Sequence, residues 1–83
     1  MKKENVIKIV ETMYRYFSDP IEQIHQKSGI ARSTISKFFN RRSLKPSTTQ
    51  IIYITCINLI EEKVKQGQEN DKKLNNLLGQ LEN

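Results

Sequence analysis

Residues 28–42 combine short hydroxyl side chains with a cluster of arginines, which suits contact with a polyanion. The stretch is SGIARSTISKFFNRR. Short Ser and Thr side chains let a helix backbone approach a surface and hydrogen-bond to it, whereas long cationic side chains reach phosphates. A surface helix that faces only water usually carries Glu and Lys instead. The residue types therefore predict hydrogen bonding and ion pairing as the chemistry of this stretch.

The positive charge of the chain lies in its first half. The 83 residues have a net charge of +5, of which residues 1–46 contribute +6 and residues 47–83 contribute −1. No acidic residue occurs from Gln23 to Ile60, so the positive field in this window is uninterrupted, as it is in proteins that bind polyanions. The alternative is a solvated face, although such faces normally include acids. The cations of the window, all of which we expect to contact the polyanion, are Lys27, Arg32, Lys37, Arg41, Arg42 and Lys45.

Two helices are expected before the polar stretch. Apolar residues at three- and four-residue spacing predict a helix over 3–17. Asp19 as N-cap and Pro20 in the first turn predict a second helix over 20–28. Gly29 should end that helix, because a left-handed residue is least costly as glycine.

Two more helices are expected after the glycine. The third should cover 31–40, and Ser47 with Gln50 forms a capping-box signature that opens the fourth. Residues 51–60 are so rich in β-branched side chains that a strand is the alternative. The expected core consists of Val6, Ile9, Val10, Met13, Phe17, Ile24, Ile30, Ile35, Phe38, Ile51, Ile54 and Ile57.

The composition changes at Lys65, where a run of nine polar or glycine residues, 65–73, precedes a row of leucines. We therefore divide the chain into a domain over 1–65 and a tail over 66–83. Gly67 and Asp71 interrupt a heptad seam in the tail, and an interior glycine costs a helix about 1 kcal/mol, which disfavours a continuous coiled coil. The tail is a short docking helix or dimer arm, or it is disordered. The seam consists of Ile57, Ile60, Val64, Gly67, Asp71, Leu74, Leu78 and Leu81.

These elements predict an all-α fold, a four- to five-helix bundle that contains a helix-turn-helix. A chain of this length supports one core. Its single cysteine, Cys56, lies in an apolar run and is expected to be buried and reduced. The same run is too short to span a bilayer, and no signal peptide is visible. We expect a soluble cytoplasmic protein without a membrane partner.

The segment from Pro20 to Glu61 resembles the lambda repressor/Cro-like helix-turn-helix superfamily. The residues that carry the resemblance are IHQKSGIARSTIS, with its turn glycine and spaced apolar positions, and RRSLKPSTTQII, with its Lys-Pro-Ser entry to the last helix. His25 stands where the family usually has alanine, so the imidazole must lean out of the helix crossing or widen it. Ala31 stands where the family usually has a Ser or Thr cap.

The resemblance implies that the third helix enters the major groove of double-stranded DNA. Arg32, Ser33, Thr34 and Lys37 would then face the groove, with Arg32 and Lys37 able to pair with guanine. Thr34 would offer its methyl group to thymine. The remaining implied contacts are Ser33 and Ser36 to base or phosphate, and Asn40, Arg41, Arg42 and Lys45 to the backbone.

The function indicated is sequence-specific DNA binding by a transcriptional regulator, most simply a homodimeric repressor of phage or plasmid type. One alternative is an antitoxin-like or adaptor protein whose residues 68–83 bind a protein partner. Another is a helix-turn-helix used only for protein contacts. No enzyme is expected, since nothing resembles a nucleophile with its base, a paired acid or a phosphate-binding glycine loop. No cofactor and no metal ligand set are expected.

Overall fold

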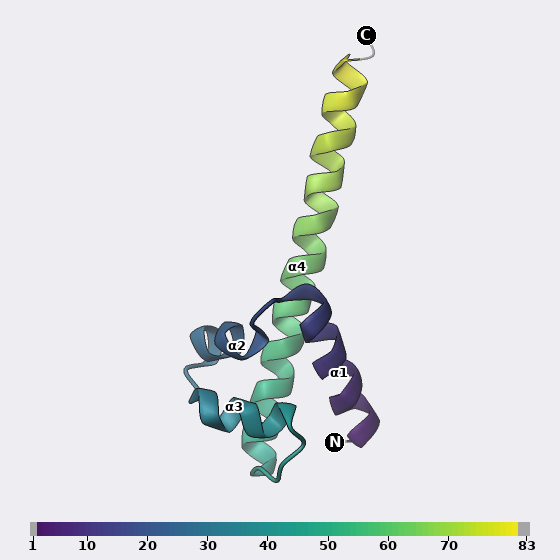
Figure 1. The fold of residues 1–83 in the computed structure, drawn as a ribbon. Helices are drawn as coiled ribbons and strands as arrows, with labels where there is room; N and C mark the ends of the chain where they lie inside the picture. The colour runs from purple at the N-terminus through teal and green to yellow at the C-terminus, as the bar shows by residue number, and fades with distance from the viewer. Residues whose placement is uncertain (1, 82–83) are drawn as a thin grey trace.

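All regular structure in the part of the chain that this computed structural model describes, residues 2–81, is helical. The expectation of an all-α protein is confirmed, and the strand alternative for residues 51–60 is wrong. The first three helices surround the first half of the last one, whose second half projects away from them (Figure 1). The elements are α1 (Lys3–Tyr16), α2 (Pro20–Ser28), α3 (Arg32–Phe39) and α4 (Pro46–Leu81).

Helix α2 begins and ends at the predicted residues because its signals are local. The Asp19 carboxylate accepts a hydrogen bond from the Glu22 N–H at 3.3 Å, and Pro20 occupies the first turn. At the other end Gly29 takes the left-handed conformation, with φ at 76°, and its N–H donates to the His25 carbonyl at 2.9 Å. Both caps are confirmed.

The turn between α2 and α3 is held by two side chains of α2. The Nδ1 of His25 lies 2.7 Å from the Ile30 carbonyl oxygen, and since that oxygen can only accept, Nδ1 carries the proton. The Ser28 hydroxyl donates to the Ile24 carbonyl at 2.7 Å and accepts from the Ile30 N–H at 3.1 Å. The imidazole therefore leans toward the turn and fixes the chain between the two helices.

The core lies on a different face of α4 from the one predicted. Ile51 and Ile54 are 51% and 47% exposed, so their predicted place in the core is wrong. Their neighbour Ile52 is fully buried, and the buried Thr55 hydroxyl donates to the Ile51 carbonyl at 2.8 Å. Helices α1 and α2 pack on this other face. The fully buried side chains are Met13, Ile24, Ile35, Ile52 and Cys56.

Helix α4 begins earlier and extends further than the sequence signals indicated. Its first residue is Pro46, so Ser47 lies inside the helix rather than capping it, and the Lys45 carbonyl accepts the Thr49 N–H at 3.0 Å. The helix passes through Gly67 without a break. Its 36 residues correspond to a length of about 54 Å. The division of roles between residues 1–65 and 66–83 stays a prediction, and residues 82–83 lie outside the described part.

The part of α4 from residue 61 to residue 79 contributes no side chain to the core. Every side chain over residues 61–79 is exposed. The molecule measures 59 × 25 × 19 Å, and the long dimension follows α4 (Figure 1). Within residues 2–81, none of the helices combines the length and the apolar content needed to cross a bilayer.

Candidate nucleic-acid interface

Helix α3 presents a polar outer face opposite three buried side chains. At 100° per residue, Ser33, Ser36, Lys37 and Asn40 project from one side of the helix. The Asn40 amide donates to the Ser36 hydroxyl at 3.2 Å, which joins two members of this face. Its short side chains leave the backbone approachable. The side chains that anchor α3 from behind are Ile35, Phe38 and Phe39.

Thr34 and Arg32 lie at opposite edges of this polar face. Thr34 turns toward the apolar side and is half-buried, so it is less available than its exposed neighbour Ser33. Arg32 turns toward α2, where its Nε and Nη2 donate to the Glu22 carboxylate at 2.5 and 2.9 Å. The same hydrogen bonds lower the pKa of Glu22 and raise that of Arg32. Arg32 is exposed, but it is held by an acid.

Lys27, at the start of the acid-free window, is paired in the same way. Its ammonium group contacts the Glu62 carboxylate on α4, 35 residues away in sequence. Glu22 and Glu62 both lie just outside the window from Gln23 to Ile60. Two of the six cations, Lys27 and Arg32, are therefore neutralised by acids. These acids lie outside the window, so counting charges within the window does not reveal them.

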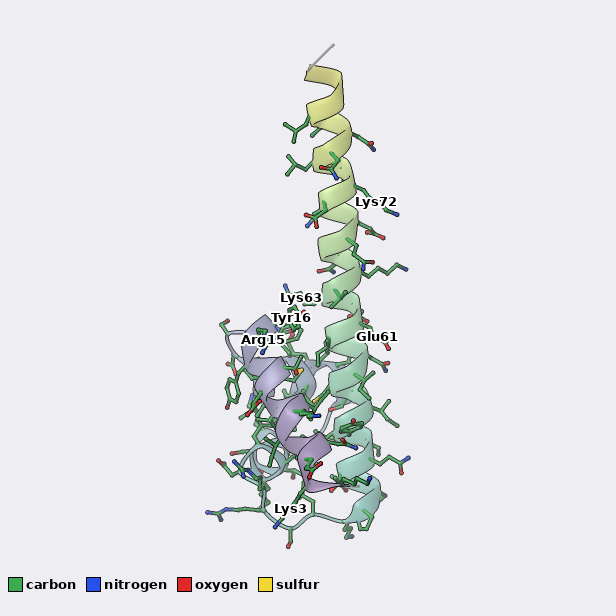
Figure 2. All side chains as sticks on the ribbon, turned by 90° about the vertical axis from the view of Figure 1, so that its right-hand side faces the viewer. Lys3, Arg15, Tyr16, Glu61, Lys63 and Lys72 are labelled. Carbon is green, nitrogen blue, oxygen red and sulfur yellow. The ribbon has the colours of Figure 1, made fainter. Side chains whose placement is uncertain are left out.

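The other four cations of the window gather where α3 ends and α4 begins. In the described range, no carboxylate lies within 4.0 Å of their charged groups. Lys3, at the start of α1, joins them, because it lines one surface hollow together with Arg41 and Arg42. Figure 2 shows Lys3 at this end of the molecule. We call Lys3, Lys37, Arg41, Arg42 and Lys45 the cation cluster.

Sequence reasoning missed Lys3, because no local pattern connects it with α3. It is separated from Arg41 by two other helices along the chain. The available signal was indirect: the apolar face of α1 has to pack on α4, and α4 starts next to the end of α3. The N-terminal end of α1 therefore comes close to the loop that carries Arg42 and Lys45.

Arg41 has the left-handed backbone conformation that glycine usually supplies after a helix. Its φ is 57°. The Arg42 N–H donates to the Lys37 carbonyl at 2.8 Å and the Arg41 N–H donates to that of Phe38 at 3.2 Å, which together form a Schellman motif. A non-glycine residue in this conformation costs about 1–2 kcal/mol. The chain keeps an arginine side chain here at the expense of stability.

Replacing Arg41 by glycine should therefore stabilise the fold and weaken polyanion binding. We expect Arg41→Gly to raise the free energy of unfolding by roughly 0.5–1 kcal/mol, because relief of the left-handed conformation outweighs the greater entropy of glycine in the unfolded chain. DNA affinity should fall at the same time, since one cation of the cluster is lost. Chemical denaturation and a DNA titration measure the two effects.

Arg42→Gly is the matched control, because Arg42 belongs to the same cluster but does not have a positive φ. It should weaken DNA binding to a similar degree without any gain in stability. A loss of stability in Arg41→Gly equal to that in Arg42→Gly would show that the backbone at Arg41 is unstrained.

Nine of the ten residues predicted to form the site fall into three groups, and the tenth, Thr34, lies at the edge of the polar face. Lys27 and Arg32 are engaged in ion pairs, the outer face of α3 is polar and exposed or half-exposed, and the cation cluster lies beside its last turn. A face of short donors next to unpaired cations suits hydrogen bonding to base edges combined with ion pairing to phosphates. Comparison of the chain with protein-family models, curated proteins and solved structures finds no match.

Proposed function

We propose that the chain is a sequence-specific double-stranded DNA-binding transcriptional regulator, a cytoplasmic homodimeric repressor of phage or plasmid type. In this proposal α2, the Gly29 turn and α3 form a helix-turn-helix, and α3 enters the major groove. The observation that carries the proposal is the position of the cation cluster. It borders the polar outer face of α3 and has no acidic partner in the described part of the chain.

The cation cluster and the polar face would have different roles. Lys3, Arg41, Arg42 and Lys45 lie beyond the last turn of α3, where they would hold phosphates and set the position of the helix on the duplex. Ser33 and Lys37 project from the outer face, with Lys37 long enough to reach guanine O6 and N7. Asn40 and Ser36 already bond to each other and would contact the DNA as a unit.

Selection of bound sequences from a random duplex pool tests this proposal. A regulator of this kind should enrich one consensus with two-fold symmetry, because a homodimer reads two copies of the same half-site. The Lys37→Ala variant, with one outer-face cation removed, should enrich a consensus that is degenerate at one position of each half-site. If the unmodified protein binds random duplexes without enriching any consensus, the proposal is wrong.

Releasing Arg32 from Glu22 should strengthen DNA binding. In Glu22→Gln the bidentate acceptor loses its charge, so Arg32 becomes available to DNA and a negative charge next to α3 disappears. We expect tighter binding and a slope of log K against log salt that steepens by about 0.9 for each new phosphate contact. The matched control is Glu11→Gln, which makes the same charge change on an exposed residue of α1. Equal affinities of the two variants would mean that Arg32 stays beside α2 when DNA is bound.

The exposed leucines of α4 support a second candidate function, in which the tail binds a protein partner as in an adaptor or antitoxin. Leu74 and Leu77 are 55% and 58% exposed on a segment that no other helix covers. An exposed apolar row commonly marks a contact surface. A pull-down with the full chain and with a chain lacking residues 68–83 distinguishes this role from DNA binding alone.

A further inference from the structure

The second half of α4 is a long helix that lacks a packing partner among residues 2–81, the part of the chain that the structure describes. Most of it projects clear of α1, α2 and α3, and Lys72 marks its middle in Figure 2. Helices in proteins owe most of their stability to tertiary packing of an apolar face. This segment also contains two glycines, at which an added Cβ would meet nothing within 4 Å. Packing of its apolar side chains against a partner would therefore stabilise it.

The apolar residues of this segment continue a stripe that begins on the head, which we define as residues 2–63. The outer seam consists of residues at alternating three- and four-residue spacing, as in a coiled coil. Its head members Ile57 and Ile60 are partly exposed, with Ile60 also packed against the core, and Val64, Leu74 and Leu78 are 39%, 55% and 48% exposed. In order the outer seam is Ile57, Ile60, Val64, Gly67, Asp71, Leu74 and Leu78.

We infer that two copies of the chain associate through this outer seam in antiparallel orientation, with Gly67 of each copy opposite Asp71 of the other. The seam is complementary to itself when it is reversed. In this register Ile60 faces the second copy's Leu78, and Val64 faces its Leu74. Such self-complementarity is what a two-fold symmetric interface requires.

Asp71 selects this register among the antiparallel ones. A shift of one heptad in one direction would place the Asp71 carboxylate against Ile60 of the second copy, and a shift in the other direction would place it against Leu74. Either arrangement buries a charge against an apolar side chain, which is costly without a partner. Opposite Gly67 there is no side chain, so the carboxylate keeps its access to water.

The parallel orientation is disfavoured by the same two residues. It would set Asp71 directly against Asp71 and Gly67 against Gly67, which gives one layer of like charges and one layer without side chains. The antiparallel register separates the two carboxylates by four residues, or about 6 Å along the axis. It also places the two heads at opposite ends of the paired helices, which keeps their positive charges apart.

Disulfide formation between introduced cysteines tests orientation and register together. We would prepare Val64→Cys, Leu74→Cys and, as a control on the opposite side of α4, Asn76→Cys. The native Cys56 remains in all of them, because it is fully buried and burial raises the pKa of its thiol to about 12. An equimolar mixture of Val64→Cys and Leu74→Cys should form a disulfide-linked dimer on mild oxidation without DNA.

Each variant alone should form little dimer. Identical positions lie ten residues apart along the axis, or about 15 Å, whereas a disulfide needs Cα atoms within about 7 Å. Efficient linkage of each single variant to itself would establish a parallel pair and overturn the inference. No linkage in the mixture above the level of the Asn76→Cys control would overturn it as well, in favour of a different partner for the tail.

A second measurement uses the unlinked protein. Leu78→Glu should shift the sedimentation of the protein toward monomer, with at least a tenfold weaker self-association, while Asn76→Glu should not. Unchanged association in Leu78→Glu would contradict the inference. The inference deepens the homodimer of the proposed function, but neither measurement involves DNA, so a failure to bind DNA and a failure to pair through α4 remain distinguishable.

Discussion

The affinity of the protein for its selected DNA site should fall by about 10³- to 10⁵-fold when salt rises from 50 to 200 mM. Four members of the cation cluster, Lys3, Arg41, Arg42 and Lys45, would hold phosphates in each chain, so a dimer has enough charged groups for the 6–10 phosphate contacts to which this range applies. None of the four is neutralised by an acid in the described residues, so their counterions are released on DNA binding rather than exchanged for an internal pair. The steep response is therefore a property of the cluster.

Titrations of labelled duplex at several salt concentrations measure this response. Lys45→Ala should reduce the slope of log K against log salt by about 0.9 per chain. Lys72→Ala removes the same charge from the projecting half of α4, far from the cluster (Figure 2), and should leave the slope unchanged. A nearly flat response of the unmodified protein would exclude phosphate contacts as the source of affinity, and with them the proposed function.

Local signals predicted the middle of the fold correctly. Asp19, Pro20 and Gly29 act within a few residues of α2, through one side-chain cap, one missing donor and one left-handed residue. The bounds of α3 were also predicted to within one residue at each end. Such features depend little on the rest of the chain, and a sequence is sufficient to identify them.

The buried face of α4 could not be predicted by the same means. Residues 51–60 are apolar on nearly every side, so more than one face satisfies the three- and four-residue spacing. The position of α1 and α2 decides that Ile52 is covered and Ile54 is not. That is a tertiary effect, and helical periodicity carries no information about it. The pairing of Lys27 with Glu62 and the arrival of Lys3 beside Arg41 are missed for the same reason.

At the end of α4, by contrast, a local signal misled the prediction. A glycine at position 67 and the absence of apolar residues around it indicated a boundary, yet the helix continues. The intrinsic cost of one interior glycine is about 1 kcal/mol, which other contributions along a helix of 36 residues can offset. Propensity is a weak predictor where the question is whether a helix extends rather than whether it forms.

Ile52→Ala should destabilise the protein by about 2–5 kcal/mol, the usual cost of truncating a fully buried aliphatic side chain to alanine. Ile52 has no exposed surface and lies in the core cluster with Ile24 and Ile35. Small domains are stable by about 5–15 kcal/mol, so this one substitution removes a large share of the total. The expected fall in Tm is at least about 8 °C for a domain of this size.

Ile51→Ala is the matched control, since it makes the same chemical change one residue away on a side chain that is 51% exposed. Its cost should stay below about 1 kcal/mol, because less apolar surface is lost and alanine is the better helix former. Thermal and urea unfolding of both variants at one protein concentration measure the difference, with the concentration fixed because association raises the apparent stability. If Ile51→Ala proves the more damaging substitution, the core packs on the face that the sequence predicted, and the exposed face of α4 lies on the other side.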